Sequence, residues 1–345
     1  SAPRLADFAR RGEFPVSRAT LFDLASVTKV VATTTMAMIL HQRGLLDLEA
    51  PITAIVPEFT SGKEADSRRH EVTVHMLLAH SSGLPAYEKL YLSASTRDRL
   101  LHAAFTTPLT ADPGSRSEYS DIGFIILGAA LERLAGEALD TFCQREVFGP
   151  LAMTSTAFNP PAKSRVQIPP TQDDHAFRHR IIQGEVQDEN AFALGGVAGH
   201  AGLFSTAEDI ARFAHAMLLC GADTPVRETQ ASQPTPGSPN PLLPGQPLLR
   251  PETVALFTCR ESTPSGTSRA LGWDTPSAPS QSGKYFTPGS FGHLGFTGTS
   301  LWIDPARQLS ITLLTNRTWP DCSNRAIRTV WPQFHDAIVE ALGAG

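Results

Sequence analysis

The sequence predicts an α+β protein, in which an antiparallel sheet in the C-terminal part of the chain is combined with a mainly helical region. Helical periodicity runs through residues 26–43, 73–80, 123–136 and 141–153. Strand-like runs then follow one another at 270–274, 291–296, 300–303 and 309–315, before a last helical pattern at 323–342. Successive short strands of this kind favour antiparallel pairing, with helices packed on the sheet.

The boundaries of several elements are marked by their end signals. The helix predicted over 26–43 has an apolar side that includes Val30, Thr34, Ala37, Met38 and Leu40. Gly44 follows it as an expected C-terminal cap. A later amphipathic helix, 209–219, is preceded by Ser205 and Glu208, which are spaced as a capping box with Ser205 as the cap. Residues 221–247 are rich in proline and are expected to form an exposed loop or insertion.

Size and charge exclude several classes of function. The 345 residues suffice for one large domain or two interleaved ones, and 41% of them are apolar. The formal net charge is −5, and no run of Lys and Arg is long enough to follow a phosphate backbone, so nucleic acid is not an expected partner. We expect a soluble protein without a membrane span, because no apolar stretch reaches the roughly 18 residues that a bilayer requires and no secretory signal opens the chain. Cytoplasm and periplasm, and the oligomeric state, stay open.

Metal and cofactor chemistry has little support in the sequence. Four scattered cysteines form no C-x-x-C pair and are expected to be free thiols: Cys143, Cys220, Cys259 and Cys322. His175 and His179 lie four residues apart beside Asp174, with His200 beyond, but no H-E-x-x-H pattern is present. We therefore expect no metal and no cofactor. The G-x-S-x-G elbow of α/β-hydrolases is also absent from the sequence.

Ser26 and Lys29 are the first candidates for catalysis. They lie three residues apart at the start of the predicted helix, and side chains at this spacing share one helix face. A lysine amine that loses its charge through burial or a neighbouring cation can activate a serine hydroxyl as a nucleophile. The first turn of a helix also offers backbone N–H groups to a developing oxyanion.

Two further motifs follow in a fixed order. Glu-Tyr-Ser-Asp at 118–121 opens an apolar helical run, and Gly-His-Leu-Gly-Phe-Thr-Gly-Thr at 292–299 leads into a strand. Together with Ser26 and Lys29, these motifs resemble the serine β-lactamase and penicillin-binding-protein superfamily. The tyrosine of the second motif and the histidine of the third are most similar to class C β-lactamases, D-alanyl-D-alanine peptidases and family VIII carboxylesterases. The connecting segments at 77–85, 148–153 and 202–213 are similar as well.

The resemblance implies a β-lactamase/transpeptidase-like fold, with the antiparallel sheet flanked by N- and C-terminal helices. It divides the chain into an α/β part, residues 1–60 and 205–345, and a mainly helical part, residues 61–204, with the catalytic cleft between them. Members of the superfamily usually place two strands before the first motif. Only 25 residues precede Ser26, and they barely supply one strand.

The resemblance assigns the catalytic roles. Ser26 is the nucleophile that becomes acylated, and Lys29 and Tyr119 share the proton transfers. A tyrosine held between two cations is expected to have a lowered pKa and to serve as a base. The backbone N–H groups of Ser26 and Phe296 form the oxyanion hole. The alternative for Tyr119 is a core aromatic residue at the start of a helix.

Asp121 departs from the asparagine that is common at this place in β-lactamases and peptidases of this type. An ionised carboxylate only accepts hydrogen bonds, whereas an amide also donates. We therefore expect Asp121 to hold Lys29 charged more firmly or to meet a donor on the substrate, which disfavours ordinary β-lactam recognition. Its alternative role is to cap the following helix.

The third motif and a glycine-rich segment supply the remaining candidates for substrate binding. His293 stands where relatives carry lysine and offers a switchable charge. Leu294 replaces a threonine whose hydroxyl often contacts a substrate carboxylate, so recognition of such an anion is expected to weaken. Gly295 permits close approach of the substrate, and Thr297 belongs to the same substrate-binding set.

The glycine-rich segment, residues 184–202, contains Asp188, Glu189, Asn190 and His200. Its glycines indicate close backbone packing at the cleft wall opposite the His293 strand. It is similar to serine hydrolases linked to bacterial cell-wall recycling. These four polar residues are expected either to shape the substrate pocket or to form a turn network that holds the loop.

The sequence thus predicts a metal-free serine hydrolase that acts through an acyl-enzyme on an ester or amide carbonyl. Small esters and peptidoglycan-derived peptides or amides are both compatible with Asp121 and Leu294. A class C-like β-lactamase or a D-alanyl-D-alanine peptidase is an alternative, with β-lactam turnover expected to be slow or absent. A non-catalytic binding or sensor domain with the penicillin-binding fold is the rival from another class.

Overall fold

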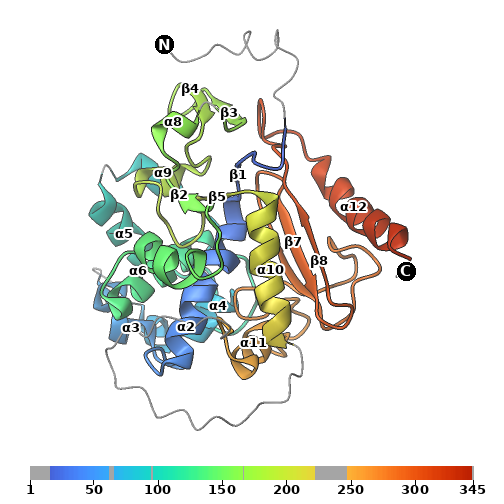
Figure 1. Ribbon diagram of the computed structural model, residues 1–345. Helices are drawn as coiled ribbons and strands as arrows, with labels where there is room; N and C mark the ends of the chain where they lie inside the picture. The colour runs from blue at the N-terminus through green and yellow to red at the C-terminus, as the bar shows by residue number, and fades with distance from the viewer. Residues whose placement is uncertain (1–15, 62–65, 95, 166, 222–246, 344–345) are drawn as a thin grey trace.

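An antiparallel sheet and a helical region meet at the first motif. The computed structural model describes residues 16–61, 66–94, 96–165, 167–221 and 247–343 (Figure 1). The sheet has the order β6-β7-β8, formed by Phe291–Leu294, Ser300–Asp304 and Leu309–Leu313. Its register pairs Gly292 with Trp302 and Trp302 with Ile311, so that consecutive strands are neighbours joined by short turns.

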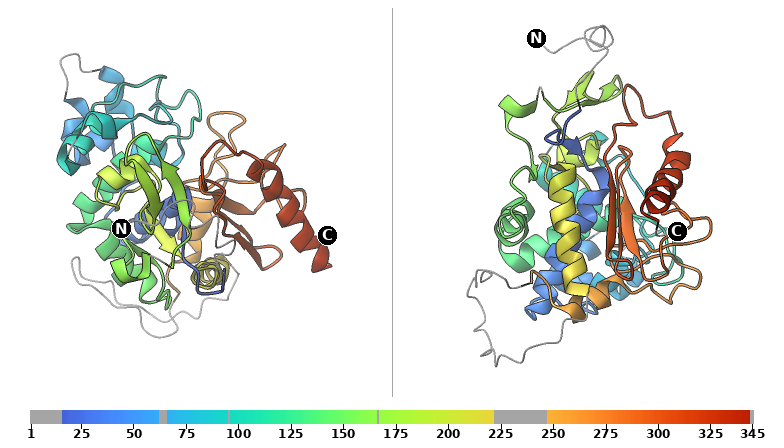
Figure 2. Two further views of the ribbon diagram at one scale, coloured as in Figure 1. Left: turned by 90° about the horizontal axis from the view of Figure 1, so that it is seen from above. Right: turned by 45° about the vertical axis from the view of Figure 1, so that its right-hand side comes forward.

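A helix covers each face of this sheet (Figures 1 and 2). The C-terminal helix α12 (Ile327–Ala341) packs on one face through its amphipathic side, which buries Trp331, His335 and Val339. Helix α10 (Ala207–Gly221) packs against β7 and β8 on the other face. The predicted fold class is therefore confirmed, although in the described residues α10, and not an N-terminal helix, takes the second face.

The remaining helices gather on the other side of α10 (Figure 1). The longest of these, α6 (Asp121–Ala135), is buried along most of its length and ends at Gly136, which adopts a left-handed φ of 70°. The others are α2 (Thr35–Gln42), α3 (Ile52–Ile55), α4 (Val74–Leu78), α5 (Arg97–Phe105), α7 (Leu139–Cys143), α8 (Ala162–Arg165), α9 (Glu189–Ala193) and α11 (Pro251–Thr258). Short 3₁₀ turns lie at Pro57–Thr60, Ser67–Glu71 and Leu90–Leu92, and a π-helical turn lies at Gln144–Phe148.

Two small sheets complete the architecture. Strand β5 (Leu203–Ser205) pairs antiparallel with β1 (Phe22–Asp23) on one side and with β2 (Ala157–Phe158) on the other. The hairpin of β3 (Pro170–Asp174) and β4 (Arg180–Gln183) stands above them (Figure 1). One short strand, β1, thus precedes the first motif, and the residues before 16 lie outside the described part of the chain.

Three predicted elements differ from the structure. Residues 26–43 form a 3₁₀ turn (Ala25–Val27), a π-helical turn (Lys29–Thr34) and α2, because the Thr35 hydroxyl donates to the Val30 carbonyl and widens the helix there. Residues 270–274 form a tight turn, closed by a bond from Ala270 N to the Trp273 carbonyl, and not a strand. Most of the proline-rich segment 221–247 lies outside the described residues.

The predicted capping box of α10 is wrong by one residue. Thr206, and not Ser205, caps the helix, because its hydroxyl accepts a hydrogen bond from Asp209 N at 3.2 Å. Ser205 belongs to β5, and its hydroxyl lies 2.7 Å from that of Thr156. Glu208 points away and pairs with Arg212.

Candidate active site

Ser26 stands on a strained turn that the sheet holds in place. The preceding residue, Ala25, has a φ of 46°, a left-handed value that non-glycine residues rarely adopt. The buried carboxylate of Asp23 fixes this turn by accepting hydrogen bonds from Ala25 N at 2.8 Å and from Gln187 N at 2.7 Å. Strain of this kind costs about 1–3 kcal/mol and persists only where surrounding contacts over-determine the backbone.

The third motif braces the same turn from the sheet side. The Thr297 and Thr299 hydroxyls donate to the carbonyls of Asp23 and Leu24, at 2.7 and 2.9 Å. Gly295 is required at this contact, because a Cβ there would lie 2.5 Å from the Leu24 carbonyl oxygen. Thr297 is buried and its hydroxyl is used in this contact. The Thr297 hydroxyl therefore braces the turn, and the expected place of Thr297 in the substrate-binding set stays a prediction.

Ser26, Lys29 and Tyr119 come together around one hydroxyl. Ser26 Oγ lies 3.1 Å from Lys29 Nζ and 2.6 Å from the Tyr119 hydroxyl. Lys29 is fully buried, and its ammonium also donates to Asp121 Oδ1 at 2.6 Å and to the His200 carbonyl at 3.0 Å. All three N–H donors of Lys29 therefore have acceptors.

The protonation states of this cluster differ from the expected ones. Burial alone would lower the pKa of Lys29, but Asp121 and Tyr119 raise it above its usual value. Burial and the charge of Asp121 raise the pKa of Tyr119 to about 12, and the opposing effect of Lys29 is too small to reverse this. The expected lowering of the Tyr119 pKa is wrong, although Lys29 and Arg269 lie 4.8 and 5.4 Å from the centre of its ring.

His293 is a neutral core residue and not a switchable charge. It is buried on β6, and burial together with the charges of Lys29 and Arg269 holds its pKa well below the usual value. Its Nδ1 lies 2.7 Å from the Leu294 carbonyl, while Nε2 is buried without a partner in the described structure. The ring centre lies 5.9 Å from that of Tyr119.

The two residues predicted to form the oxyanion hole, Ser26 and Phe296, lie in the first helical turn and just after the end of β6. Phe296 follows the strand, its side chain is 49% exposed, and its carbonyl accepts a 2.6 Å hydrogen bond from Arg317 Nε. Within the described residues, Phe296 N donates to no acceptor. Ser26 lies in the first turn of its helix, where backbone N–H groups lack intrahelical partners.

The glycine-rich segment holds Lys29 from the helical side. Gly199 packs so closely on α6 that a Cβ on Gly128 would lie 2.9 Å from the Gly199 Cα, and the next residue, His200, presents its carbonyl to Lys29. The His200 ring is buried and bonds Asp188 at 2.8 Å. Asp188 also caps α9 through Ala191 N at 2.7 Å. Asp188 and His200 therefore belong to the turn network that was one of the two expected roles.

Asn190 belongs to the turn network, whereas the expected role of Glu189 in the substrate pocket stays a prediction. Asn190 is buried and ties the loop to the backbone of Glu88 and Tyr91. Glu189 keeps partial exposure, and its carboxylate receives a long hydrogen bond of 3.3 Å from the Tyr87 hydroxyl.

Two residues close to Tyr119 were missed by sequence reasoning. His80 lies in the run Leu-Leu-Ala-His-Ser-Ser-Gly at 77–83. Its ring centre is 4.7 Å from that of Tyr119, and its Nδ1 accepts a hydrogen bond from Ser120 N. Arg269 carries no local signal, because it precedes the third motif by a long irregular segment. The His80 ring, in contrast, could have been suspected from its place in a segment that resembles the superfamily.

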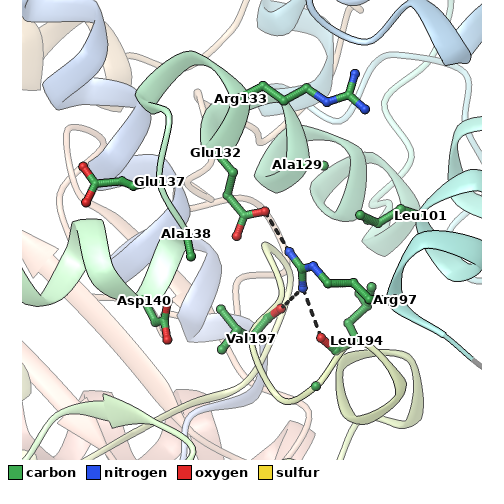
Figure 3. A pocket seen from close by; sticks show the side chains of 11 residues that line it. Arg97, Leu101, Ala129, Glu132, Arg133, Glu137, Ala138, Asp140, Leu194 and Val197 are labelled. Atoms are coloured by element: carbon green, nitrogen blue, oxygen red, sulfur yellow. Dashed lines mark hydrogen bonds and ion pairs between the residues drawn. The ribbon is translucent and has the colours of Figure 1, made fainter.

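A separate cavity of about 480 Å³ lies behind the glycine-rich segment (Figure 3). It is lined by side chains of α5, α6 and α7 and by the loop at 194–197. Arg97 crosses it, donating to the Leu194 and Val197 carbonyls and to Glu132. None of the three motifs contributes to its lining.

The cysteines and the remaining histidine candidates lie away from the three motifs in the sequence. All four cysteines are free thiols, as predicted. In the described part of the chain, no group of three His, Cys, Asp or Glu side chains could hold a metal ion. His175 is 84% exposed and contacts only Asp173, at 3.4 Å. No helix among the described residues has the length and apolarity to cross a bilayer.

Comparison with known proteins places these motifs in a family. The β-lactamase family model matches residues 5–330. An N-acetylmuramyl-L-alanine amidase of Bacillus subtilis (strain 168) is 32% identical over 322 residues, which cover 86% of this chain and 68% of that protein. An inferred D-alanyl-D-alanine carboxypeptidase of Escherichia coli (strain K12) is 31% identical and covers 86% of this chain and 69% of its own.

A solved structure shows the same fold. EstCE1, described as a hydrolase with promiscuous acyltransferase activity, superposes with a TM-score of 0.69 at 22% identity, over 95% of this chain and 87% of its own. The match of the family model over nearly the whole sequence, with the first two motifs joined at the Ser26 hydroxyl and the third braced against the same turn, shows that this chain belongs to the β-lactamase family and is a serine hydrolase.

Proposed function

We propose that this protein hydrolyses an amide bond of a peptidoglycan-derived peptide through an acyl-enzyme on Ser26. The observation that carries the proposal is the contact of one serine hydroxyl with both a lysine amine, at 3.1 Å, and a tyrosine hydroxyl, at 2.6 Å. These distances lie within or near the range of about 2.6–3.2 Å in which a side chain can move a proton to or from a nucleophile.

The first step is a proton transfer that produces a base. Because the pKa values of Lys29 and Tyr119 are both raised, the free enzyme holds an ammonium and a neutral phenol, and neither accepts a proton at pH 7. Asp121 is the carboxylate in contact with this pair, 2.6 Å from Lys29 Nζ. Transfer of one ammonium proton to Asp121 leaves a neutral amine beside Ser26.

Attack on the carbonyl follows. The Lys29 amine takes the hydroxyl proton while Ser26 Oγ forms a bond to the carbonyl carbon, and the carbonyl oxygen becomes an oxyanion. The backbone N–H groups of Ser26 and Phe296 bind this oxyanion, a stabilisation of about 2.7–4 kcal/mol for each donor in comparable sites. Phe296 N suits the role because it has no other acceptor in the described structure.

Departure of the amine completes acylation. As the C–N bond breaks, the leaving nitrogen takes the phenol proton of Tyr119, and the phenolate then recovers a proton from Lys29. Asp121 returns its proton to Lys29, which restores the starting charges. Deacylation repeats the route with water. Lys29 again passes a proton to Asp121, its neutral amine takes a proton from water as the water oxygen attacks the ester, and Lys29 gives that proton to Ser26 Oγ as the serine leaves. Asp121 then returns its proton to Lys29.

The substrate class rests on the relatives and on the geometry of the cleft. The proteins that are 31–32% identical are named for an amidase and a carboxypeptidase, whose names specify amide bonds of the bacterial cell wall. We place the cleft between the α/β part, residues 1–60 and 205–345, and the helical part, residues 61–204. The Lys29–Asp121 ion pair supports this division because it joins the two parts.

A carboxylesterase of small neutral esters is the second candidate. Leu294 is partly exposed and the Phe296 side chain is 49% exposed, so that the edge of the cleft at β6 has an apolar character. Such an edge favours an ester with an apolar acyl group. β-Lactam turnover is expected to be slow, because Asp121 lacks the amide donor of an asparagine.

Covalent labelling followed by a comparison of substrates tests the proposal. A fluorophosphonate should label the native chain and not Ser26→Ala, with Ser323→Ala, which changes an exposed serine, as the matched control. A muropeptide, p-nitrophenyl butyrate and nitrocefin should then be hydrolysed in that order of kcat/KM. Absence of labelling would support the non-catalytic sensor instead, and a preference for the butyrate would support the esterase.

A further inference from the structure

A buried carboxylate connects the turn before Ser26 to the glycine-rich segment. Asp23 ends the short strand β1, and only 2% of the residue is exposed. Its two oxygens accept from different backbone N–H groups, Oδ1 from Ala25 at 2.8 Å and Oδ2 from Gln187 at 2.7 Å. An ionised carboxylate accepts at both oxygens, whereas a protonated one carries an O–H at one of them. Both bonds therefore depend on the charge of Asp23.

The first of these bonds holds the residue that precedes the nucleophile. Ala25 has a φ of 46°, and a backbone of this kind persists only where neighbouring contacts hold it. The donor to Asp23 is the N–H of Ala25 itself, so the bond closes over the strained residue. Loss of this acceptor would let the turn relax and would move the Ser26 hydroxyl away from Lys29 and Tyr119.

The second bond leads to Lys29 through the glycine-rich segment. Gln187 is followed by Asp188, whose carboxylate lies 2.8 Å from His200 Nε2. The His200 carbonyl accepts in turn from Lys29 Nζ at 3.0 Å. The same carboxylate thus anchors both the turn that carries the nucleophile and the loop that orients the amine.

The surroundings of Asp23 make its neutral form unusually favourable. Burial is the main effect, and together with the like charge of Asp188 it raises the pKa of Asp23 from 3.8 to about 6. The two backbone N–H groups and the guanidinium of Arg178 act in the opposite direction, but Arg178 is itself paired with Asp174 at 2.9 Å. Strand β5 and the Thr297 hydroxyl, which also contact Asp23, are uncharged. The carboxylate therefore changes its ionisation at mildly acidic pH.

We propose that Asp23 is a positioning residue whose carboxylate must be ionised to hold Ser26 and Lys29 in place for acylation. The inference rests on the proposed role of Ser26 as the nucleophile. When Asp23 takes up a proton from the solvent, one of its two N–H partners loses its acceptor, the strain at Ala25 is no longer opposed, and the serine hydroxyl is displaced. The protein then loses reactivity in acid while it stays folded.

The rate of labelling by a fluorophosphonate tests the proposal, because it measures attack by Ser26 without a deacylation step. The quantity to compare is the maximal labelling rate, kinact, at pH 7.5 and at pH 5. Because a group that titrates near pH 6 is about nine-tenths protonated at pH 5, kinact of the native chain should fall roughly 5- to 10-fold. The concentration for half-maximal labelling should change by less than about twofold, since Asp23 acts through the turn and not on the reagent.

Asp23→Asn keeps the shape of the protonated acid and does not ionise. Its single oxygen accepts from only one of the two N–H groups, so kinact at pH 7.5 should be roughly 10- to 100-fold lower than that of the native chain. Lowering the pH to 5 should cause no further loss.

Asp304→Asn is the matched control. Asp304 is also buried, and its two oxygens also accept from different backbone N–H groups, those of Thr287 and Arg307. It lies at the end of β7 that is remote from the third motif. Against the effect of burial, the bonds from Thr287 and Arg307 lower the pKa of Asp304, so it stays ionised at pH 5. This variant should keep the native dependence of kinact on pH.

Relief of the strain provides a second, independent variant. Glycine adopts a φ of 46° without steric cost, so Ala25→Gly should make the turn less dependent on the carboxylate. Its loss of kinact between pH 7.5 and pH 5 should be less than about half of the native loss, and Asp23→Asn should cost less in this background, because the two residues are coupled. Ala152 has a φ of 53° at an exposed position, so Ala152→Gly relieves the same strain elsewhere and should behave as the native chain.

The outcomes separate this inference from the proposed function. Circular dichroism at both pH values shows whether each protein is folded. A loss of kinact in acid that is as large in Asp23→Asn as in the native chain would overturn the inference. Equal losses in the native chain and in Ala25→Gly would do the same, and this comparison holds even if Asp23→Asn does not fold. Native labelling that is as fast at pH 5 as at pH 7.5 would refute the role of Asp23 and leave the serine hydrolase mechanism intact. If Ser26 is not labelled at either pH, the proposed function fails, and the role of Asp23 fails with it.

Discussion

Asp121 is the residue that most distinguishes this site from one built with an asparagine. Its carboxylate lies 2.6 Å from Lys29 Nζ, and its charge raises the pKa values of both Lys29 and Tyr119. Asp121 therefore prevents Lys29 and Tyr119 from acting as bases in the free enzyme. In the proposed mechanism, Asp121 also takes up a proton when the reaction begins. In this mechanism, catalysis at neutral pH depends on the proton exchange between Lys29 and Asp121.

Asp121→Asn should separate these two effects. Without the carboxylate, the pKa of Lys29 falls, since Asp121 is the main group that raises it, but the site loses its proton acceptor. We expect kcat/KM for p-nitrophenyl butyrate at pH 7 to fall by roughly 10²–10⁴-fold, the usual contribution of a general base. Activity should return as the pH rises and the amine of Lys29 becomes neutral, which a profile from pH 6 to 10 would reveal.

Asp140→Asn is the control, since it removes a similar charge at the first turn of α7, away from Ser26. Native-like activity of Asp121→Asn at pH 7, with an unchanged profile, would contradict the relay through Asp121.

The neutrality of His293 gives a second prediction at this scale. Because burial, Lys29 and Arg269 hold its pKa well below the usual value, His293 stays uncharged from pH 6 to 8. The kcat/KM profile of the native enzyme over this range should therefore contain no step that disappears in His293→Gln. The variant is expected to lose less than about tenfold in kcat/KM, as expected for a residue that packs and does not transfer protons. A step near pH 6.5 that is present only in the native enzyme would show that His293 titrates.

At the scale of elements, the sequence predicted which helices and strands exist better than it predicted the residues at which they begin and end. Helix α6 was expected over 123–136 and spans Asp121–Ala135, because an apolar run between a serine cap and a left-handed glycine defines a helix locally. The strands β6, β7 and β8 were predicted for similar reasons. The stretch 270–274 was misread as a strand because its turn is held in place by a contact between distant segments, in which the Gly272 N–H donates to the Leu78 carbonyl.

In the candidate site as well, local sequence signals were predictable and contacts between distant segments were not. Ser26 and Lys29 were identified from their spacing and Tyr119 from the family resemblance of its motif, and the structure brings the three side chains together at the Ser26 hydroxyl. The pKa of Tyr119 could not be predicted, because it depends on how deeply the ring is buried and on where the Asp121 carboxylate lies. Arg269 was missed because a lone arginine in an irregular segment has no sequence pattern.

The contact of α6 with the glycine-rich segment provides a prediction about packing. A Cβ at Gly128 would meet the Cα and N of Gly199 at 2.9 and 3.0 Å, so Gly128→Ala forces this segment away from the helix. Overpacking typically costs about 1–3 kcal/mol. The displaced segment includes the His200 carbonyl that holds Lys29, so kcat should fall together with the melting temperature.

Gly123→Ala is the matched control in the same helix. A Cβ at Gly123 would meet its nearest neighbours at 3.5 and 3.6 Å, which are ordinary contacts. Alanine is favoured over glycine in a helix by roughly 1 kcal/mol, so this variant should be as stable as the native chain or more stable. Equal melting temperatures for the two variants would mean that the close approach of Gly199 is not required.

On the scale of the whole molecule, the C-terminal helix α12 is attached to the central sheet by buried side chains. Helix α12 buries Trp331, whose indole N–H donates to the carbonyl of Gly298 in the third motif, at 3.0 Å. It also buries His335, which lies between the Ser300 hydroxyl of β7, at 3.0 Å, and the Gln281 carbonyl, at 3.1 Å. The last helix of the chain is thus tied to the strand next to the active site.

The ionisation of His335 makes the stability of the folded protein, through this helix–sheet contact, dependent on pH. Burial lowers its pKa from 6.5 to about 4 in the folded protein, although two backbone carbonyls act in the opposite direction. Between these two values the unfolded chain binds a proton that the folded chain does not, so protons favour unfolding. The stability that depends on neutral His335 is complete above about pH 6.5 and is lost as the pH falls toward 4. From this shift, the free energy of unfolding should decrease by about 2 kcal/mol between pH 7.5 and pH 5.

His335→Gln should remove this part of the pH dependence. Glutamine can keep one of the two hydrogen bonds but does not ionise, so the variant is expected to be less stable than the native protein at pH 7.5 and closer to it at pH 5. Urea unfolding at the two pH values measures the difference, and the other histidines cancel because both proteins contain them. His215→Gln, which changes a more exposed histidine on α10, serves as the control and should follow the native protein. The native protein and His335→Gln could instead lose the same free energy of unfolding between the two pH values. His335 would then have to be protonated in the folded state at pH 5. In that case the contact between α12 and β7 would depend on an imidazolium that donates to both the Ser300 hydroxyl and the Gln281 carbonyl.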